Sequence, residues 1–139
     1  MSKISGHCLC GNLNYSSDAD PILTGLCHCV ACQRQSGSAY SVNVAVPYDS
    51  LKIEGLTLKI FTTVGGSGQT AQVLFCGNCG STIASNAEAI PGVAFIKAGT
   101  LDDTSWVDPT LEIWSESAQT WIEHDESRQL AARNPPMAA

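Results

Sequence analysis

Hydrophobic and polar residues alternate along much of the chain with the two-residue period of a half-buried β-strand. The alternation is clearest over residues 40–46, where Tyr40 and three valines are separated by smaller or more polar residues. Three further strands are predicted, at residues 58–63, 70–75 and 93–98. Glycine-rich or Pro-Gly turns precede or separate these segments, as expected between short strands.

Helical periodicity is brief by comparison. Residues 30–35 allow a single helical turn, and residues 115–121 fit neither period clearly. The glycine-rich stretch GGSGQT at residues 65–70 lacks the Lys-Ser/Thr pair of a phosphate-binding loop and is flanked by predicted strands, so a plain connection is expected. The pattern therefore predicts a mostly β domain with few short helices.

Composition and charge narrow the class of protein. With 139 residues, of which 44% are hydrophobic, the chain is expected to form one domain at residues 1–124 and a partly disordered tail at residues 125–139. A formal net charge of −6 argues against nucleic acid as a partner, because phosphate binding needs a positive surface. No run approaches the roughly 18 apolar residues that span a bilayer, and no apolar leader follows Met1. We therefore expect a cytoplasmic protein without a membrane partner.

The candidate chemistry lies in seven cysteines. In a reducing cytoplasm, clustered cysteines are more often metal ligands or catalytic thiols than disulfides, and an odd number leaves at least one unpaired. They form three clusters: CLC at residues 8–10, CHCVAC at residues 27–32 and CGNC at residues 76–79.

The first and third clusters together predict a closed metal site. Residues two apart on a strand point to the same side, so Cys8 and Cys10 can face one ion. A Cys-x-x-Cys turn with glycines aims Cys76 and Cys79 at a common point. Four thiolates make a common structural zinc centre, and two redox dithiols are the alternative.

The middle cluster holds three thiolates, Cys27, Cys29 and Cys32, and no cysteine remains to complete it. A catalytic zinc typically has three protein ligands and one position for water or substrate, so an open catalytic site is predicted. His28 or His7 could instead close the site as a fourth ligand. Against that, a strand-like backbone would turn the His28 ring away from the metal, and His7 has a surface or hydrogen-bonded role by default.

Other residues carry weaker hypotheses. Residues 36–38, Ser-Gly-Ser, could offer polar groups to a ligand or simply form a turn, and Asp102 and Asp103 are interpreted as a turn rather than an acid–base pair. Arg34 could pair with a substrate carboxylate, although surface solvation is favoured. An ordinary surface or hydrogen-bonded role is expected of His124. The three tryptophans could line a pocket, but they are assigned to the core: Trp106, Trp114 and Trp121.

Four motifs in this order resemble the glutathione-dependent formaldehyde-activating enzyme (GFA) family, which also includes centromere protein V-like domains. They are GHCLCG at residues 6–11, CHCVACQRQSG at residues 27–37, FCGNCGS at residues 75–81 and AGTLDD at residues 98–103. The match runs over about residues 6–121. Each motif alone is weak, but the combination is highly specific.

The resemblance implies a β-tent fold, in which small antiparallel sheets lean together over a zinc centre. It also implies a structural zinc on Cys8, Cys10, Cys76 and Cys79 and a labile catalytic zinc on Cys27, Cys29 and Cys32. The namesake activity adds glutathione to formaldehyde to give S-hydroxymethylglutathione, and members are commonly labelled carbon–sulfur lyases. The expected partner is therefore a small thiol such as glutathione.

Two other functions stay open at this point. A non-catalytic zinc-stabilised β domain could bind a protein or a small ligand, but it would not need the CHCVAC cluster. A thiol redox protein would oxidise reversibly with loss of metal. In the catalytic case the metal either activates the thiol directly or acts through a bound water, and the sequence favours neither.

Overall fold

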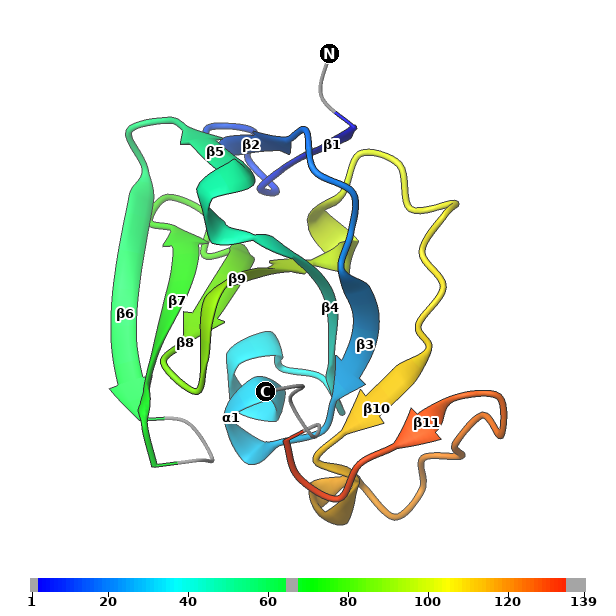
Figure 1. The fold of residues 1–139 in the computed structure, drawn as a ribbon. Coiled ribbons are helices and arrows are strands. Elements are labelled where there is room, and N and C mark those ends of the chain that lie inside the picture. The colour runs from blue at the N-terminus through cyan, green and yellow to red at the C-terminus, as the bar shows by residue number, and fades with distance from the viewer. Residues whose placement is uncertain (1–2, 65–67, 135–139) are drawn as a thin grey trace.

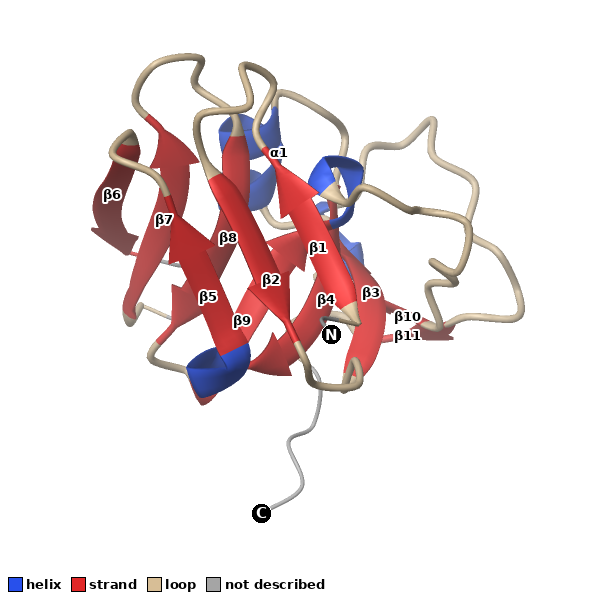
Figure 2. Ribbon diagram, turned by 90° about the horizontal axis from the view of Figure 1, so that it is seen from above, coloured by secondary structure: helices blue, strands red, loops and turns tan. Residues whose placement is uncertain are grey.

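Two β-sheets of unequal size pack against each other in the computed structural model, which describes residues 3–64 and 68–134. The smaller sheet has the strand order β1-β2-β5 and lies across one face of the larger sheet (Figure 2). Its strands are β1 (Ile4–His7), β2 (Asn14–Ser17) and β5 (Leu51–Glu54). The mostly β class predicted from the alternation is therefore confirmed.

The larger sheet has the order β11-β10-β3-β4-β9-β8-β7-β6 and curves around the middle of the molecule (Figure 1). Its strands are β3 (Leu23–Cys27), β4 (Ser41–Pro47), β6 (Leu58–Val64), β7 (Thr70–Cys76), β8 (Thr82–Ala87), β9 (Ile90–Lys97), β10 (Leu111–Ile113) and β11 (Gln129–Leu130). Neighbours pair antiparallel, except that β10 runs parallel to both β3 and β11.

Helical structure among the described residues is limited to short pieces. They are α1 (Val30–Ser36) and the 3₁₀ turns η1 (Tyr48–Ser50), η2 (Ala98–Thr100) and η3 (Ser115–Ser117). The predicted single turn at residues 30–35 is thus the one α-helix, and it ends at Gly37, whose φ of 65° is left-handed. Part of the predicted glycine-rich connection, residues 65–67, lies outside the described residues.

The core lies between the two sheets. Val44 and Val46 of β4 pair in register with Ile96 and Ala94 of β9, and all four are buried on the face toward the small sheet. Ile4 and Tyr15 from the small sheet belong to the same cluster. Because successive side chains of a strand point to opposite faces, the residues between these valines belong to the second face of the large sheet.

Gly6 shows how closely the small sheet approaches the rest of the chain. A Cβ atom at this position would overlap the Tyr15 ring and the backbone oxygen of Thr100. Gly6 also forms an isolated antiparallel bridge with Leu101. The first motif therefore begins with glycine because no side chain fits where β1 meets the chain after η2.

The C-terminal part of the described chain continues past residue 124 as part of the sheet. The strand β11 pairs with β10, and the Ala131 N–H donates to the carbonyl of Glu112 at 2.9 Å. Of the partly disordered tail predicted at residues 125–139, the structure describes residues 125–134, and residues 135–139 lie outside the described residues. Within the described ranges, no helix has the length and hydrophobicity needed to cross a bilayer.

The assignment of the tryptophans to the core is wrong. Trp121 is 70% exposed and Trp106 37% exposed, while Trp114 is half-buried beside a cavity. The space between the sheets is filled by aliphatic side chains and Tyr15, so no room is left for an indole there.

Candidate metal centres

Two matching turns bring four cysteines together at one end of the core. Cys8 follows β1 and Cys76 ends β7, and each is followed by a turn that carries the second cysteine of its pair. In each turn, a glycine with positive φ donates its N–H to the carbonyl of the first cysteine, from Gly11 at 3.1 Å and from Gly80 at 2.8 Å. The glycines let the chain turn tightly enough to direct both sulfurs inward.

The four sulfurs, from Cys8, Cys10, Cys76 and Cys79, all lie within 4.8 Å of one another. The Sγ atoms of Cys8 and Cys10 are 3.6 Å apart, and those of Cys10 and Cys76 are 3.7 Å apart. Sulfurs bound about 2.3 Å from a tetrahedral zinc lie about 3.8 Å apart, whereas a disulfide bond is about 2.05 Å long. The cluster therefore fits a metal ion such as zinc.

Hydrogen bonds prepare this cluster for thiolate chemistry. The backbone N–H of Leu13 donates to Cys8 Sγ at 3.3 Å, and the N–H of Asn78 donates to Cys76 Sγ at 3.4 Å. Hydrogen bonds from the side chain and backbone of Ser81 lower the pKa of Cys79 to about 5. These donors favour the charged thiolate, which is the form that binds a metal.

The second cluster, Cys27, Cys29 and Cys32, is built at the junction of a strand and a helix. Cys27 ends β3, Cys29 caps the N-terminus of α1, and Cys32 lies in the first turn of the helix. The Sγ of Cys29 accepts the backbone N–H of Cys32 at 3.2 Å. The three sulfurs lie within 4.8 Å of one another, and no fourth Cys, His, Asp or Glu of the described residues joins the group.

The thiols of this cluster are electrostatically coupled. Hydrogen bonds from the thiols of Cys27 and Cys29 lower the pKa of Cys32, and the charge of Lys97 and the Ser41 hydroxyl act in the same direction. The hydrogen bonds that Cys27 makes with Cys29 and Cys32, together with burial, raise the pKa of Cys27. A bound cation would take the place of these shared protons.

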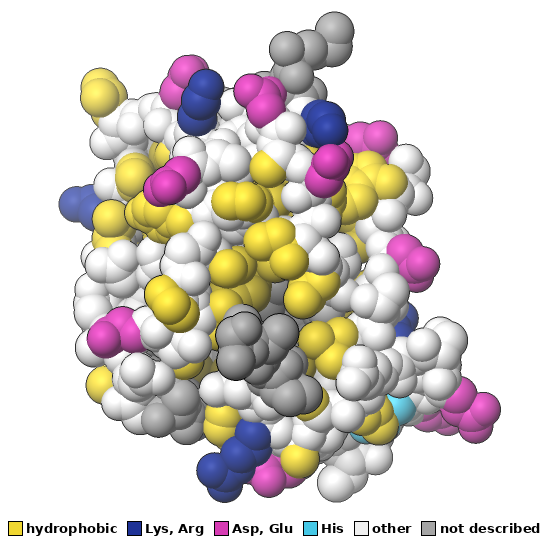
Figure 3. Space-filling model, in the orientation of Figure 1, with side chains coloured by type: hydrophobic (Ala, Val, Ile, Leu, Met, Phe, Trp, Pro, Cys, Tyr) yellow, Lys and Arg dark blue, Asp and Glu magenta, His cyan; other side chains and the backbone are white. Residues whose placement is uncertain are grey.

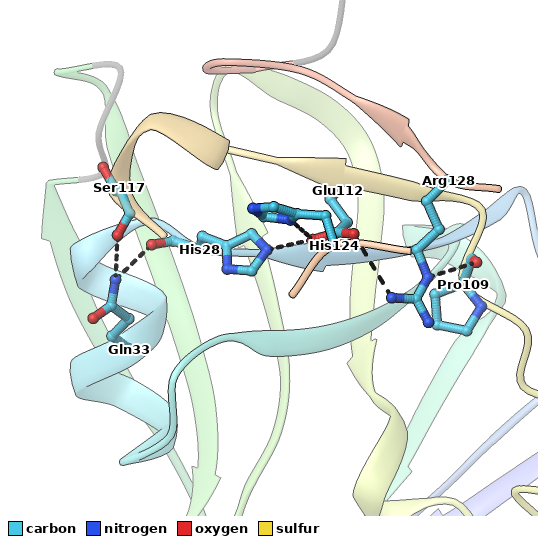
Figure 4. A network of polar contacts seen from close by, with 7 residues as sticks. All are labelled: His28, Gln33, Pro109, Glu112, Ser117, His124 and Arg128. Carbon is cyan, nitrogen blue, oxygen red and sulfur yellow. Dashed lines mark hydrogen bonds and ion pairs between the residues drawn. The ribbon is translucent and has the colours of Figure 1, made fainter. Parts of the chain in front are cut away.

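His28 takes no part in either cysteine cluster. Its ring is fully buried, and its Nε2 lies 2.7 Å from Glu112 Oε1. The same carboxylate oxygen lies 2.7 Å from His124 Nδ1, and Arg128 Nη1 is 3.7 Å from Glu112 Oε2 (Figure 4). Burial alone would raise the pKa of Glu112, but the hydrogen bonds from His124 and His28 outweigh it and hold the pKa below its usual range.

This group of His28, Glu112 and His124 is a hydrogen-bonded network. An ionised carboxylate only accepts hydrogen bonds, so both facing histidine nitrogens carry a proton and donate to it. The 2.7 Å distances are those of charge-assisted hydrogen bonds. The guanidinium of Arg128 supplies a positive charge near the buried Glu112 carboxylate, so no metal cation is needed to balance it. Sequence reasoning missed Glu112, although an acidic residue between Leu111 and Ile113 in a strand was a usable signal.

A second set of polar contacts supports the helix that carries Cys29 and Cys32. The Gln33 side-chain amide donates to the carbonyl of His28 at 2.7 Å and to that of Ser117 at 3.0 Å (Figure 4). It therefore ties α1 to both the strand β3 and the turn η3. The backbone on both sides of the three sulfurs is fixed by groups that are not themselves ligands.

Lys97 lies near the three sulfurs: burial lowers the pKa of its ammonium, while the negative charges of Cys32, Cys27 and Cys29 act to raise it. Cys27 and Ser41 are register partners in β3 and β4, as are Asn43 and Lys97 in β4 and β9, so all four lie on the second face of the sheet. The Lys97 ammonium donates to Asn43 Oδ1 at 2.9 Å, and Asn43 Nδ2 donates to Ser41 Oγ at 3.1 Å. This polar row leads from the lysine to the cysteine cluster.

The three sulfurs face open space. A cavity of about 120 Å³ is lined by Cys27, Cys29 and Cys32. It shares Cys29 and Trp114 with a surface groove of about 780 Å³ that also includes Arg34. None of the four cysteines Cys8, Cys10, Cys76 and Cys79 lines either of these two cavities.

The model for the family described as glutathione-dependent formaldehyde-activating enzyme matches residues 3–117. The chain belongs to this family. Its two leaning sheets fit the β-tent arrangement that the motifs implied. Membership of the GFA family indicates a glutathione-related, formaldehyde-activating or related function, and the family is typically enzymatic.

Among solved structures, a crystal structure of a Rhodobacter sphaeroides protein is similar to this GFA-family chain, with a TM-score of 0.58 and 19% sequence identity. The similarity covers 76% of this chain and 91% of the other. At that level of identity it shows a shared fold. No curated protein matches the chain.

The remaining GFA motif, at residues 98–103, forms a turn. Asp103 accepts hydrogen bonds from the backbone and hydroxyl of Ser105 at 2.9 and 2.6 Å. Asp102 Oδ1 lies 2.7 Å from His7 Nδ1, and Asp102 belongs to neither cysteine cluster. The two carboxylates therefore have structural partners, as the turn interpretation predicted, and His7 has the hydrogen-bonded role expected of it.

Proposed function

We propose that this protein is a zinc-dependent enzyme of the carbon–sulfur lyase type, which forms or cleaves the adduct of a small thiol and an aldehyde. The observation that carries the proposal is the cluster of Cys27, Cys29 and Cys32, whose sulfurs converge beside a cavity with no fourth Cys, His, Asp or Glu ligand among the described residues. Three protein ligands and an open position are typical of catalytic rather than structural zinc. Glutathione and formaldehyde are the reference substrates of the family.

The two cysteine clusters have different roles in this proposal, one structural and one catalytic. Cys8, Cys10, Cys76 and Cys79 hold a structural zinc, since four thiolates leave no open position. Cys27, Cys29 and Cys32 hold the catalytic and more labile zinc. We place the protein in the cytoplasm, because clustered cysteines in a reducing compartment are more often metal ligands than disulfides.

The reaction joins the thiol sulfur to the carbonyl carbon. The new C–S bond forms as the π bond of the carbonyl breaks, and the proton lost by the thiol ends on the oxygen, so an S-hydroxyalkyl adduct results. A zinc ion on the three cysteines supplies the Lewis acidity that favours thiolate over thiol near neutral pH. The reverse reaction cleaves the adduct into thiol and aldehyde.

The residues around the sulfurs provide the surroundings for this step. Lys97, held by Asn43, offsets part of the negative charge that three thiolates bring together. Trp114 and Phe95 line the cavity beside the sulfurs. Arg34 lies on the adjoining groove, where its guanidinium can meet a carboxylate of the thiol.

Metal content and adduct kinetics test the proposal together. Wild type should bind two zinc ions per chain and accelerate adduct formation, measured by NMR exchange between free aldehyde and adduct. Cys32→Ser should bind one zinc ion, lose at least 100-fold in rate and keep its circular dichroism spectrum.

Glu54→Gln, at an exposed position of the small-sheet strand β5, provides the control. This variant should keep both metal ions and its rate. Two zinc ions in Cys32→Ser, or an unchanged rate, would refute the assignment. A wild type that binds two zinc ions and accelerates no adduct would favour the non-catalytic binding domain.

A further inference from the structure

The second face of the large sheet carries the cavities around the three sulfurs. Strand register places Leu23, Gly25 and Cys27 of β3 on this face, opposite Ala45, Asn43 and Ser41 of β4. Phe95 pairs with Ala45, and Leu111 with Gly25, which extends the face over β9 and β10. Figure 3 shows hydrophobic side chains gathered in the middle of this face.

A small apolar cavity lies on this face directly beside Cys27. Its volume is about 90 Å³, and its wall comes mainly from Leu23, Ala45, Val93, Phe95 and Leu111. It shares Cys27, Asn43 and Phe95 with the cavity that holds the three sulfurs, so the two spaces adjoin. We call it the inner cavity, and the 780 Å³ space beside Arg34 the outer groove.

The inner cavity and the outer groove lie on different sides of the three sulfurs. Cys27 borders the inner cavity, whereas Cys29 borders the outer groove. An adduct bound by its sulfur therefore has two directions in which its arms can extend. The large, open groove suits the bulkier thiol, and the small inner cavity suits the group attached to the carbonyl carbon.

Size limits what enters the inner cavity. A cavity of about 150 Å³ in another protein binds benzene, so a space of about 90 Å³ suits a smaller group of a few carbon atoms. Formaldehyde has no carbon substituent and would leave this space unfilled. An unfilled apolar pocket contributes nothing to substrate binding.

The lack of charged side chains further limits which groups can enter the inner cavity. No Lys, Arg, Asp or Glu of the described residues lines the inner cavity or the cavity at the sulfurs. In the outer groove Arg34 is the one such residue within the described ranges. A charged substituent on the carbonyl carbon would lose its hydration without gaining a partner.

We propose that the carbonyl substrate is a short-chain aliphatic aldehyde larger than formaldehyde, whose alkyl chain occupies the inner cavity during adduct formation. This inference rests on the proposed function. The thiol sulfur bonds to the aldehyde carbon, the proton of the thiol passes to the oxygen, and the alkyl group remains attached to the carbon and is buried against Phe95 and Val93.

A chain-length series tests the proposal on the zinc-loaded protein. The aldehydes are formaldehyde, acetaldehyde, propanal, butanal and hexanal, each with 2-mercaptoethanol and, in parallel, with glutathione. Each enzymatic kcat/KM is divided by the uncatalysed rate constant of the same pair, which removes differences in intrinsic reactivity. The ratio should rise roughly fourfold per buried methylene up to propanal or butanal and fall at hexanal.

Filling or enlarging the inner cavity should change the aldehyde chain length at which the corrected kcat/KM is highest. Ala45→Leu should lower the ratio of butanal to formaldehyde at least tenfold, because the added side chain occupies the space. Val93→Ala should shift the optimum to an aldehyde longer by one or two carbons, and it keeps the test available if Ala45→Leu fails to fold. Ala19→Leu, in the connection between β2 and β3, is the matched control and should keep the wild-type profile.

A binding measurement separates this inference from the proposed function. Saturation-transfer NMR on the zinc-loaded protein should show contact with butan-1-ol, reduced in Ala45→Leu, and little with methanol. If no aldehyde reacts faster with either thiol, the proposed function fails, whatever butan-1-ol does. If adducts form but chain length has no effect, or formaldehyde leads the corrected series, the inner-cavity proposal is overturned and the proposed function stands.

Discussion

The two cysteine clusters hold their sulfurs within the same short distance of one another, yet their surroundings differ. The cluster of Cys8, Cys10, Cys76 and Cys79 is closed by its own fourth sulfur. The cluster of Cys27, Cys29 and Cys32 lacks a fourth ligand among the described residues and borders a cavity. The comparison teaches that ligand number and access to open space, rather than sulfur spacing, distinguish a structural from a catalytic centre in this fold.

The clusters are also supported by different means. Backbone turns with Gly11 and Gly80 shape the four-cysteine cluster. The three-cysteine cluster depends on side chains that belong to other strands, above all the buried network of His28 and Glu112. The first centre therefore joins two local turns that the fold brings together from different sheets, whereas the second is a single local segment whose backbone is held by tertiary contacts.

Cys8→Ser should have the most severe effect, because it removes a ligand of the centre that fastens both sheets. Structural zinc contributes roughly 10–16 kcal/mol in zinc-finger peptides, which is comparable with the whole stability of a domain. We expect loss of the folded circular dichroism spectrum at 25 °C, in contrast to the folded Cys32→Ser. A folded Cys8→Ser that binds one zinc ion would remove the distinction between the centres.

Glu112→Ala should destabilise the three-cysteine half of the molecule by about 3–5 kcal/mol, because it leaves the buried His28 N–H without an acceptor and removes the carboxylate partner of the more exposed His124. Denaturant unfolding of the metal-loaded protein measures this loss. Glu116→Ala is the control: Glu116 forms an exposed pair with Arg133, and its removal should cost less than about 1 kcal/mol. Equal losses in the two variants would contradict the supporting role of the network.

Tyr15 reports on the small-sheet half at high pH. Burial raises the pKa of its phenol to about 12 from an ordinary value of 10. The raised pKa favours the neutral phenol in the folded state and so contributes about 3 kcal/mol to the free energy of unfolding. This stabilisation is fully present below pH 10 and is lost as the pH rises through 12.

The Tyr15 prediction is measured by difference from Tyr15→Phe. Ionisation of the Tyr15 phenol changes the absorbance at 295 nm. This change should be present in wild type, absent from Tyr15→Phe and centred near pH 12. Between pH 10 and 12 wild type should lose stability relative to the variant. A midpoint near pH 10 would show that the phenol is open to solvent and that the two sheets do not pack closely at this point.

Lys97→Met should have a smaller effect, confined to the three-cysteine cluster. Loss of the ammonium removes a positive charge beside three thiolates, and we expect zinc affinity there to fall about tenfold, or about 1.4 kcal/mol. Competition with a chelating dye measures this change, and Lys97→Arg should restore part of it. Lys52→Met, on an exposed strand of the small sheet, is the matched control. A loss that appears equally at the four-cysteine cluster would contradict a local electrostatic role.

The sequence allowed much of the fold and of the metal centres to be predicted. The alternation of Val42, Val44 and Val46 located β4, and the predicted segments at residues 58–63 and 70–75 are β6 and β7. The grouping of the cysteines into four and three agrees with the groups whose sulfurs converge in the structure. These features depend on the local pattern of residues or on the number of cysteines, so residue type and spacing alone predict them.

Other features escaped prediction because they depend on contacts between distant segments. Glu112 gains its role only when β10 pairs parallel to β3 and brings it to His28, 84 residues away in sequence. Lys97 reaches the neighbourhood of the sulfurs through the register of β9 on β4. The exposed Trp121 was assigned to the core because hydrophobicity alone carries no information about which side chains fill the space between two sheets.

The sequence by itself determined the family, the mostly β class and the inventory of sulfurs, since each of these is written in residue type and spacing. The tertiary structure decided what surrounds each group of sulfurs: the buried network behind His28, the cation near Cys32 and the cavities in front. The physical reason is that a coordination set follows from counting ligands, whereas electrostatic environment and accessible volume exist only after distant strands have paired and packed.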